Sequence, residues 1–114
     1  MRYMMVIHND DAALAAANQQ QLWADYAAFN QALAKAGAGF TNGERLQPGK
    51  HGTIVRSRAG RTEVLDGPYT DTKEQFAGYF FIEADTIEEA VDWANRCPSA
   101  RFGAIEIRQV VGTE

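Results

Sequence analysis

The sequence predicts an α+β fold in a single domain that spans residues 1–114. Two observations support this prediction. Residues 2–8 and 78–84 are short segments with apolar residues on both alternating faces, which is typical of strands covered on both sides. Each is followed by a segment whose apolar residues recur every three or four positions, as they do along one face of a helix.

The first half of the chain begins with a strand and continues as a long helical stretch. Residues 9–11 are good N-cap or turn residues, so the helical stretch is expected over residues 11–36, with an interruption near residues 18–21. Gly37 then supplies a helix stop. The predicted apolar stripe consists of Leu22, Tyr26, Phe29, Leu33 and Ala36.

The middle of the chain changes to a strand pattern. Residues 40–46 predict a weak strand with a turn or bulge at Asn42-Gly43. Residues 53–57 and 61–65 predict a hairpin. Residues 66–68, Asp-Gly-Pro, then break the chain sharply.

The last part repeats the strand–helix–strand pattern. Thr86 opens a helix with Glu89 in a capping box, and Pro98 ends that helix before a closing strand over residues 104–110. The full order is β-α-β, a hairpin and β-α-β. This order predicts a ferredoxin-like β-α-β-β-α-β protomer with an extra hairpin, in which right-handed crossovers place both helices on one face of the sheet.

The opposite face of that sheet is expected to be apolar as well. It would carry Met4, Val6 and one side of residues 79–82. A large open apolar sheet face is uncommon on a monomer. We therefore expect a symmetric homodimer that packs sheet against sheet.

Composition excludes several classes of function. The chain has 11 Lys and Arg against 15 Asp and Glu, a net charge of −4, which disfavours a nucleic-acid partner. Its first apolar run, residues 3–7, is too short for a signal peptide or a membrane span. The single cysteine, Cys97, excludes an intrachain disulfide and suits a reducing cytoplasm. We expect a cytoplasmic protein.

No cofactor or metal is predicted. Residues 43–51 approach a phosphate-binding loop, but the spacing is one residue too long and His51 stands where Ser or Thr must bind Mg²⁺. Residues 37–39 lack the third glycine of a dinucleotide-binding turn. His8 and His51 have no flanking carboxylate pattern of the kind that zinc sites show.

Asp66 is the strongest candidate for a catalytic group. It leaves a strand just before a rigid Gly-Pro turn that would fix the direction of its carboxylate, so it could act as a base. The alternative is an Asx-turn, in which the side chain bonds the following backbone. His8, at the end of the first strand, could share a proton with Asp66 if the two strand ends are neighbours.

Three further residues are candidates for substrate binding. Glu44, like its neighbour Arg45, lies near the end of a predicted central strand and could face the same cleft. Lys73 follows the Asp-Gly-Pro turn, and Tyr26 lies on the apolar stripe of the first helix. The alternatives are a solvated surface pair for Lys73 and a core position for Tyr26. The exposed loop residue His51 is expected to be solvated, Trp23 and Trp93 to pack, and Cys97 to be a small buried residue.

Several segments resemble a known family. The signature DGPYTDTKEQFAGY at residues 66–79 is similar to Asp-Gly-Pro-Phe-x-Glu-Thr-Lys-Glu-x-x-Gly-Gly-Tyr/Phe in the DGPF branch of the YCII-related family. Residues 2–7, 88–94 and 97–100 resemble the opening strand, last helix and exit of that family. This signature departs from the pattern at Tyr69, Asp71 and Ala77, and the family often has Tyr in place of His8.

The resemblance implies a dimeric α/β barrel of ferredoxin-like protomers, with no established biochemical role. A recurring His and Asp in the family suggest an enzyme. Fusion of the DGPF branch to sigma-70-type factors suggests a part in transcription. Our first hypothesis is a small acid/base enzyme acting on a small, partly apolar molecule in a cleft near Asp66. The alternative is a non-catalytic ligand-binding or regulatory module with a sigma-type factor as its partner.

Overall fold

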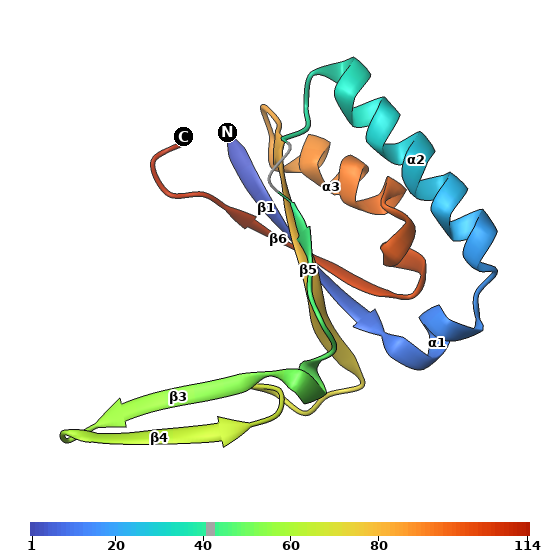
Figure 1. Ribbon diagram of the computed structural model, residues 1–114. Helices are drawn as coiled ribbons and strands as arrows, with labels where there is room; N and C mark the ends of the chain where they lie inside the picture. The colour runs from blue at the N-terminus through green and yellow to red at the C-terminus, as the bar shows by residue number, and fades with distance from the viewer. Residues whose placement is uncertain (41–42) are drawn as a thin grey trace.

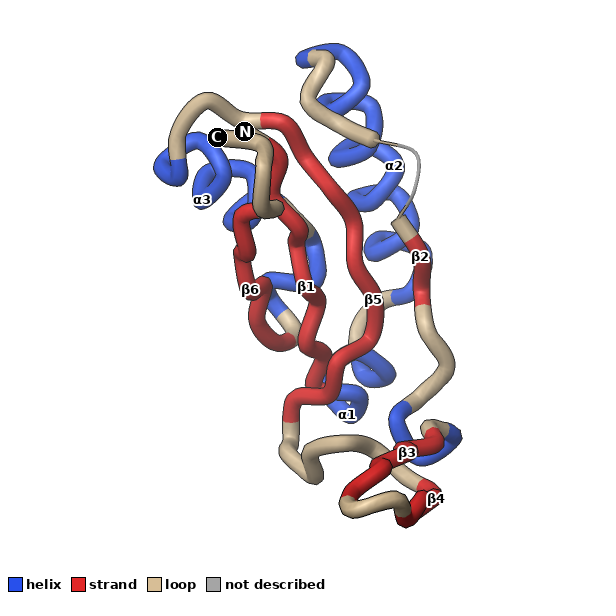
Figure 2. Tube along the Cα trace, turned by 90° about the vertical axis from the view of Figure 1, so that its left-hand side faces the viewer, coloured by secondary structure: helices blue, strands red, loops and turns tan. Residues whose placement is uncertain are grey.

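A four-stranded antiparallel sheet forms the body of the protein (Figures 1 and 2). The computed structural model describes residues 1–40 and 43–114. The strand order is β2-β5-β1-β6, and β3 and β4 form a separate two-stranded sheet. The strands are β1 (Arg2–Asp10), β2 (Glu44–Arg45), β3 (Thr53–Arg58), β4 (Arg61–Asp66), β5 (Glu74–Glu83) and β6 (Gly103–Gln109). The helices are α1 (Asp11–Ala16), α2 (Gln19–Ala36) and α3 (Ile87–Arg96), with short 3-10 turns η1 (Gly49–His51) and η2 (Pro98–Arg101).

This topology confirms the predicted ferredoxin-like protomer. The two central strands, β1 and β5, pair with each other, and each lies inside the crossover of the other β-α-β unit. Figures 1 and 2 show α2 and α3 on the same face of the sheet, as right-handed crossovers require. No helix of the described residues is long and apolar enough to cross a membrane.

The predicted helix boundaries are confirmed, including the interruption. Asp10 caps α1 by accepting a hydrogen bond from the Ala13 backbone N–H, and Asn18 caps α2 by accepting one from Gln21. Thr86 caps α3 through the Glu89 N–H, but the Glu89 carboxylate accepts from the Asp85 N–H, one residue before the position a capping box predicts.

The second and fifth strands differ most from the predicted lengths. The strand expected over residues 40–46 is reduced to Glu44–Arg45, and residues 41–42, with half of the predicted Asn42-Gly43 turn, lie outside the described part of the chain. β5 begins at Glu74, four residues before the expected start, because its first residues pair with the end of β1. The sequence did not indicate a strand at this position, because Glu74 and Gln75 are two consecutive polar residues and break the apolar pattern.

The hydrophobic core lies between the sheet and the helices. Met5 of β1 and Ile82 of β5 are completely buried, and Phe29, Leu33 and Ala90 cover them from α2 and α3. Ala36, the last residue of the predicted stripe, is exposed at the end of α2. The other buried apolar members are Tyr3, Ala38, Ala84, Ala94 and Cys97.

The opposite face of the sheet carries the second apolar layer that the sequence predicts. Met4 pairs with Phe81 and Val6 with Tyr79, so these four side chains alternate away from the core. The Tyr79 and Phe81 rings are in edge contact, with centroids 6.0 Å apart. No helix of the described residues covers this face (Figures 1 and 2). We call Met4, Val6, Tyr79 and Phe81 the open face.

The β3–β4 hairpin projects from the sheet on the side of the open face (Figures 1 and 2). It confirms the hairpin predicted for residues 53–65, with pairing from Thr53 opposite Asp66 to Arg58 opposite Arg61. Val55 and Val64 face each other across it and are 63% and 61% exposed. An isolated two-stranded hairpin is marginally stable in water, so such an arm normally needs a further contact.

Candidate functional site

A large cavity lies on the helical side of the sheet, between α2 and the β2–β5 edge. Its volume is about 840 Å³. Most of its wall is apolar, and its aromatic members include Trp23, Tyr26, Phe40 and Phe80. Its polar members are Asn9, Gln19, Asn30, Glu44, Arg45 and Ser99.

Glycine at position 78 sets the shape of this cavity. β2 pairs with β5 through Glu44 opposite Tyr79 and Arg45 opposite Gly78. A Cβ atom on Gly78 would lie 2.7 Å from the Glu44 carbonyl oxygen, so any other residue would push β2 away from β5. This close approach fixes the Arg45 backbone at the cavity edge.

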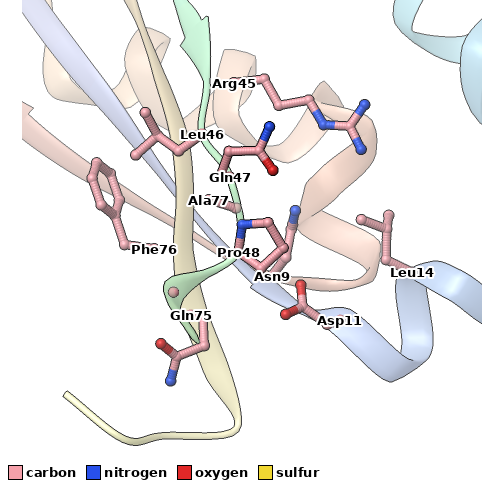
Figure 3. Close-up of a pocket in the computed structure, with 11 residues that line it drawn as sticks. Asn9, Asp11, Leu14, Arg45, Leu46, Gln47, Pro48, Gln75, Phe76 and Ala77 are labelled. Atoms are coloured by element: carbon pink, nitrogen blue, oxygen red, sulfur yellow. The ribbon is translucent and has the colours of Figure 1, made fainter. Parts of the chain in front are cut away.

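A smaller cavity of about 90 Å³, which charged and apolar residues line together, adjoins the first (Figure 3). The two share Asn9, Leu14, Arg45 and Ala77, so they are neighbouring parts of one site. Arg45 borders the small cavity from β2 and Asp11 borders it from α1. Gln47, Pro48 and Gln75 complete much of its wall (Figure 3). The site therefore has an apolar body and a polar end that carries both signs of charge.

Asn9 lies where the two cavities meet. It is 8% exposed, and its Oδ1 atom accepts no hydrogen bond within the described part of the chain. Nearly all buried polar side-chain atoms in proteins have a partner, so an unpaired one calls for an explanation.

Tyr26, Ser99 and Cys97 form a buried polar cluster at the wall of the large cavity. The Tyr26 hydroxyl hydrogen-bonds with the Ser99 Oγ and lies 3.7 Å from the Cys97 Sγ. Burial raises the pKa of the Tyr26 phenol, and a second contribution comes from Cys97. Burial likewise raises the pKa of the Cys97 thiol. Both groups therefore remain protonated at neutral pH, and Cys97 is a buried residue as predicted.

The structure brings two of the five predicted site residues, Tyr26 and Glu44, to the large cavity. Asp66 is elsewhere: it ends β4 in the projecting hairpin, is exposed, and borders neither cavity. The turn that follows has a structural role, because the Gly67 N–H donates to the Gly52 carbonyl 2.8 Å away. Pro68 packs so close to Gly49 that a Cβ there would lie 3.0 Å from the proline ring.

His8 and Asp66 do not form the expected pair. Alternation along β1 places His8 on the side of the open face, where its Nε2 shares a 3.0 Å hydrogen bond with Glu106 Oε1 of β6. This bond, followed by the Arg108 guanidinium, holds the pKa of the Glu106 carboxyl below its ordinary value. The expected convergence failed because Asp66 belongs to a separate sheet.

Lys73 makes an ion pair with Asp10, with its Nζ 3.3 Å from the Asp10 Oδ2. The Ala13 N–H lowers the pKa of the Asp10 carboxyl most, and Lys73 lowers it further. Since Asp10 also caps α1, Lys73 links the loop before β5 to the start of that helix.

Sequence reasoning missed part of the site. Trp23 was expected to pack, but it is 67% exposed at the edge of the large cavity. Trp93 does pack, with its ring centroid 6.2 Å from that of Phe29. The sequence did not indicate that Asp11 or Ser99 would border a cavity. Asp11 lies in the first turn of a helix, and Ser99 follows the proline that ends one. Their roles depend on which segments meet in space.

The Tyr26 cluster predicts a loss of stability at alkaline pH. The unfolded chain releases the Cys97 and Tyr26 protons near the ordinary pKa values of 9.0 and 10.0, whereas the folded chain retains them to higher pH. The stabilisation is thus complete below these values and is lost as pH rises through them. We expect the free energy of unfolding, measured with urea, to fall between about pH 8 and pH 10.5.

Tyr26→Phe should make this decline shallower, and Tyr69→Phe, at an exposed ring, is the matched control. An equal decline in Tyr26→Phe and the wild type would contradict the assignment of Tyr26.

Comparisons with known proteins agree with this architecture. The model of the YCII-related domain family matches residues 1–113. An uncharacterized protein of Rhizobium meliloti (strain 1021) is 30% identical over 113 residues, covering 95% of this chain and 90% of that protein.

A solved structure is similar in fold at 15% sequence identity, with a TM-score of 0.54 over 96% of this chain and 93% of that one. It is a 5-chloro-2-hydroxyhydroquinone dehydrochlorinase (TftG) from Burkholderia phenoliruptrix AC1100, in complex with 2,5-dihydroxybenzoquinone. At this identity the similarity shows the shared fold alone. The family match extends over nearly the whole chain, and the protein belongs to the YCII-related domain family.

Proposed function

We propose that the protein is a small acid/base enzyme that binds a small, partly apolar molecule in the cavity beneath α2. The cavity itself carries this proposal. Its volume of about 840 Å³ is within the range of small-molecule sites. Its aromatic wall, with Asn9 and Arg45 where it meets the small cavity, suits a ligand with an apolar body and one polar edge.

The polar end supplies the groups that proton transfer needs. The Asp11 carboxylate can accept a proton, and the Arg45 guanidinium can stabilise the negative charge that remains on the substrate. Strand alternation turns Glu44 to the opposite face from Arg45, so Asp11 is the better-placed carboxylate. His8, Asp66 and Lys73 are not part of this proposal, because neither cavity reaches them.

The ligand of the structurally similar dehydrochlorinase supplies a probe. The compound 2,5-dihydroxybenzoquinone combines a flat ring with acidic hydroxyl groups. Calorimetric titration should detect its binding to the wild-type protein. Ala27→Phe, which fills the cavity from α2, should abolish binding, whereas Ala28→Phe, on the same helix but outside the lining, should not. Equal binding to both variants would place the ligand elsewhere.

Proton transfer can be measured on the same probe. Its ring hydrogens exchange with D₂O through keto tautomers, and an acid/base enzyme should accelerate this exchange, followed by proton NMR. Asp11→Asn should slow the catalysed rate by about 100-fold or more while the probe still binds. Asp92→Asn, exposed on α3, is the control. Binding with no acceleration by the wild type would favour the alternative of a non-catalytic ligand-binding or regulatory module.

We also propose that the protein is a homodimer that pairs through the open face, as the DGPF branch implies. Both faces of the sheet are apolar, and only one has helices over it within the described residues. The hairpin projects on the same side and exposes Val55 and Val64. A second copy can cover both surfaces by a two-fold axis, which makes the contact self-complementary.

Sedimentation should therefore give twice the monomer mass of 12.6 kDa at micromolar concentration. Val6→Asp places a charge at the centre of the open face and should yield monomers, because an unpaired buried charge is strongly unfavourable. Val91→Asp, exposed on α3, should remain dimeric. A monomeric wild-type protein would refute the dimer and leave the cavity proposal standing.

A further inference from the structure

We propose that the cavity binds the conjugate base of an acidic hydroxy compound, such as an enol, a phenol or a hydroxy acid, and that Arg45 holds its anionic oxygen. This names the ligand class and rests on the proposed function, since it requires that the cavity bind a small molecule. Three features of the polar end support it: a cation without a partner in the described residues, a buried amide oxygen without a partner there, and a carboxylate that limits the charge of the ligand.

Arg45 is a cation fixed at the cavity edge. Its backbone is held in β2 opposite Gly78, and its side chain extends toward the helical side of the sheet (Figure 3). Within the described residues it makes no ion pair and stacks on no ring, in contrast to Arg2, Arg96, Arg101 and Arg108. A guanidinium has five N–H donors in a planar fork that matches carboxylate and enolate oxygens. Arg45 is therefore available to a ligand.

Asn9 supplies a second polar group beside Arg45. Its side chain is more than nine-tenths buried, and Oδ1 lacks a donor in the described part of the chain. A hydroxyl group of the ligand would donate to Oδ1, or the amide nitrogen would donate to an anionic oxygen, because a carboxamide offers both. Asn9 and Arg45 border both cavities, so one ligand edge can reach both residues.

A carboxylate restricts the charge of the ligand. Asp11 borders the small cavity, as Arg45 does. It would repel a multiply charged anion, such as a phosphate ester, and it can accept a hydrogen bond from a neutral hydroxyl group. The site thus favours a single negative charge next to a hydroxyl group. The remaining wall, including Leu22, Phe40 and Phe80, suits an apolar ring or chain.

Two matched pairs of probes test this inference. Each pair compares an acid that carries a single negative charge near neutral pH with its neutral ether or ester: 2-hydroxy-1,4-naphthoquinone with 2-methoxy-1,4-naphthoquinone, and salicylate with methyl salicylate. We expect the wild-type protein to bind the acids more tightly. Arg45→Gln should weaken binding of the acids by about tenfold or more and leave binding of the neutral compounds unchanged. Arg58→Gln, at the end of the hairpin arm, is the matched control and should have no effect.

The outcomes separate the inference from the function on which it rests. Neutral and acidic probes that bind equally well, with no effect of Arg45→Gln, would overturn the anion preference while the cavity proposal survives. Failure of every probe to bind, with the fold of the protein intact by circular dichroism, would refute the binding cavity and the inference with it. Rising salt should weaken only the acids, because screening acts on the ion pair.

Discussion

The pairing of β1 with β5 is the interaction on which the rest of the structure depends. It joins the two β-α-β units at the centre of the sheet and buries Met5 and Ile82 completely. Because side chains alternate along both strands, the same pairing sends a second apolar layer to the open face. A register shift between Ile7 and His8 leaves Ala77 as an extra residue in β5. On the N-terminal side of this bulge Gln75 borders the small cavity, and Ala77 borders both cavities.

The cavity exists because α2 does not pack closely against the β2–β5 edge of the sheet. Phe29 and Leu33 pack α2 firmly against the core at one end, whereas Trp23 at the other end remains exposed. β2 has only two residues, so little sheet lies beneath this part of the helix. Aromatic rings form much of the cavity wall, and the polar side chains of Asn9 and Arg45 border it where it meets the small cavity. A site of this kind, between helices and sheet, is compatible with many chemistries, because the fold itself does not determine the reaction.

The segment at residues 66–79, Asp-Gly-Pro onward, has a structural role that a purely catalytic interpretation would overlook. Its Gly-Pro turn packs on the loop that contains Gly49 and Gly52, Lys73 pairs with Asp10 at the cap of α1, and Gly78 lets β2 approach β5. The first contact joins two loops, the second ties a loop to the end of β1, and the third holds β2 close to β5. The segment thus positions the loops and strands around the site, and its residues Gln75 and Ala77 also border the small cavity.

The sequence by itself determined the fold class, because apolar periodicity, caps such as Asp10 and Thr86, and the order of elements are local properties. It also predicted the two apolar faces of the central strands, and two of its candidate residues, Tyr26 and Glu44, border the large cavity. Only the tertiary structure decided which strand ends meet. Asp66 lies in a separate hairpin, and His8 of β1 hydrogen-bonds with Glu106 of the neighbouring strand β6. Asn9, Asp11 and Arg45, from three different elements, all border the small cavity. Alternation and periodicity say which way a side chain points along its own segment, but not which distant segment lies opposite it.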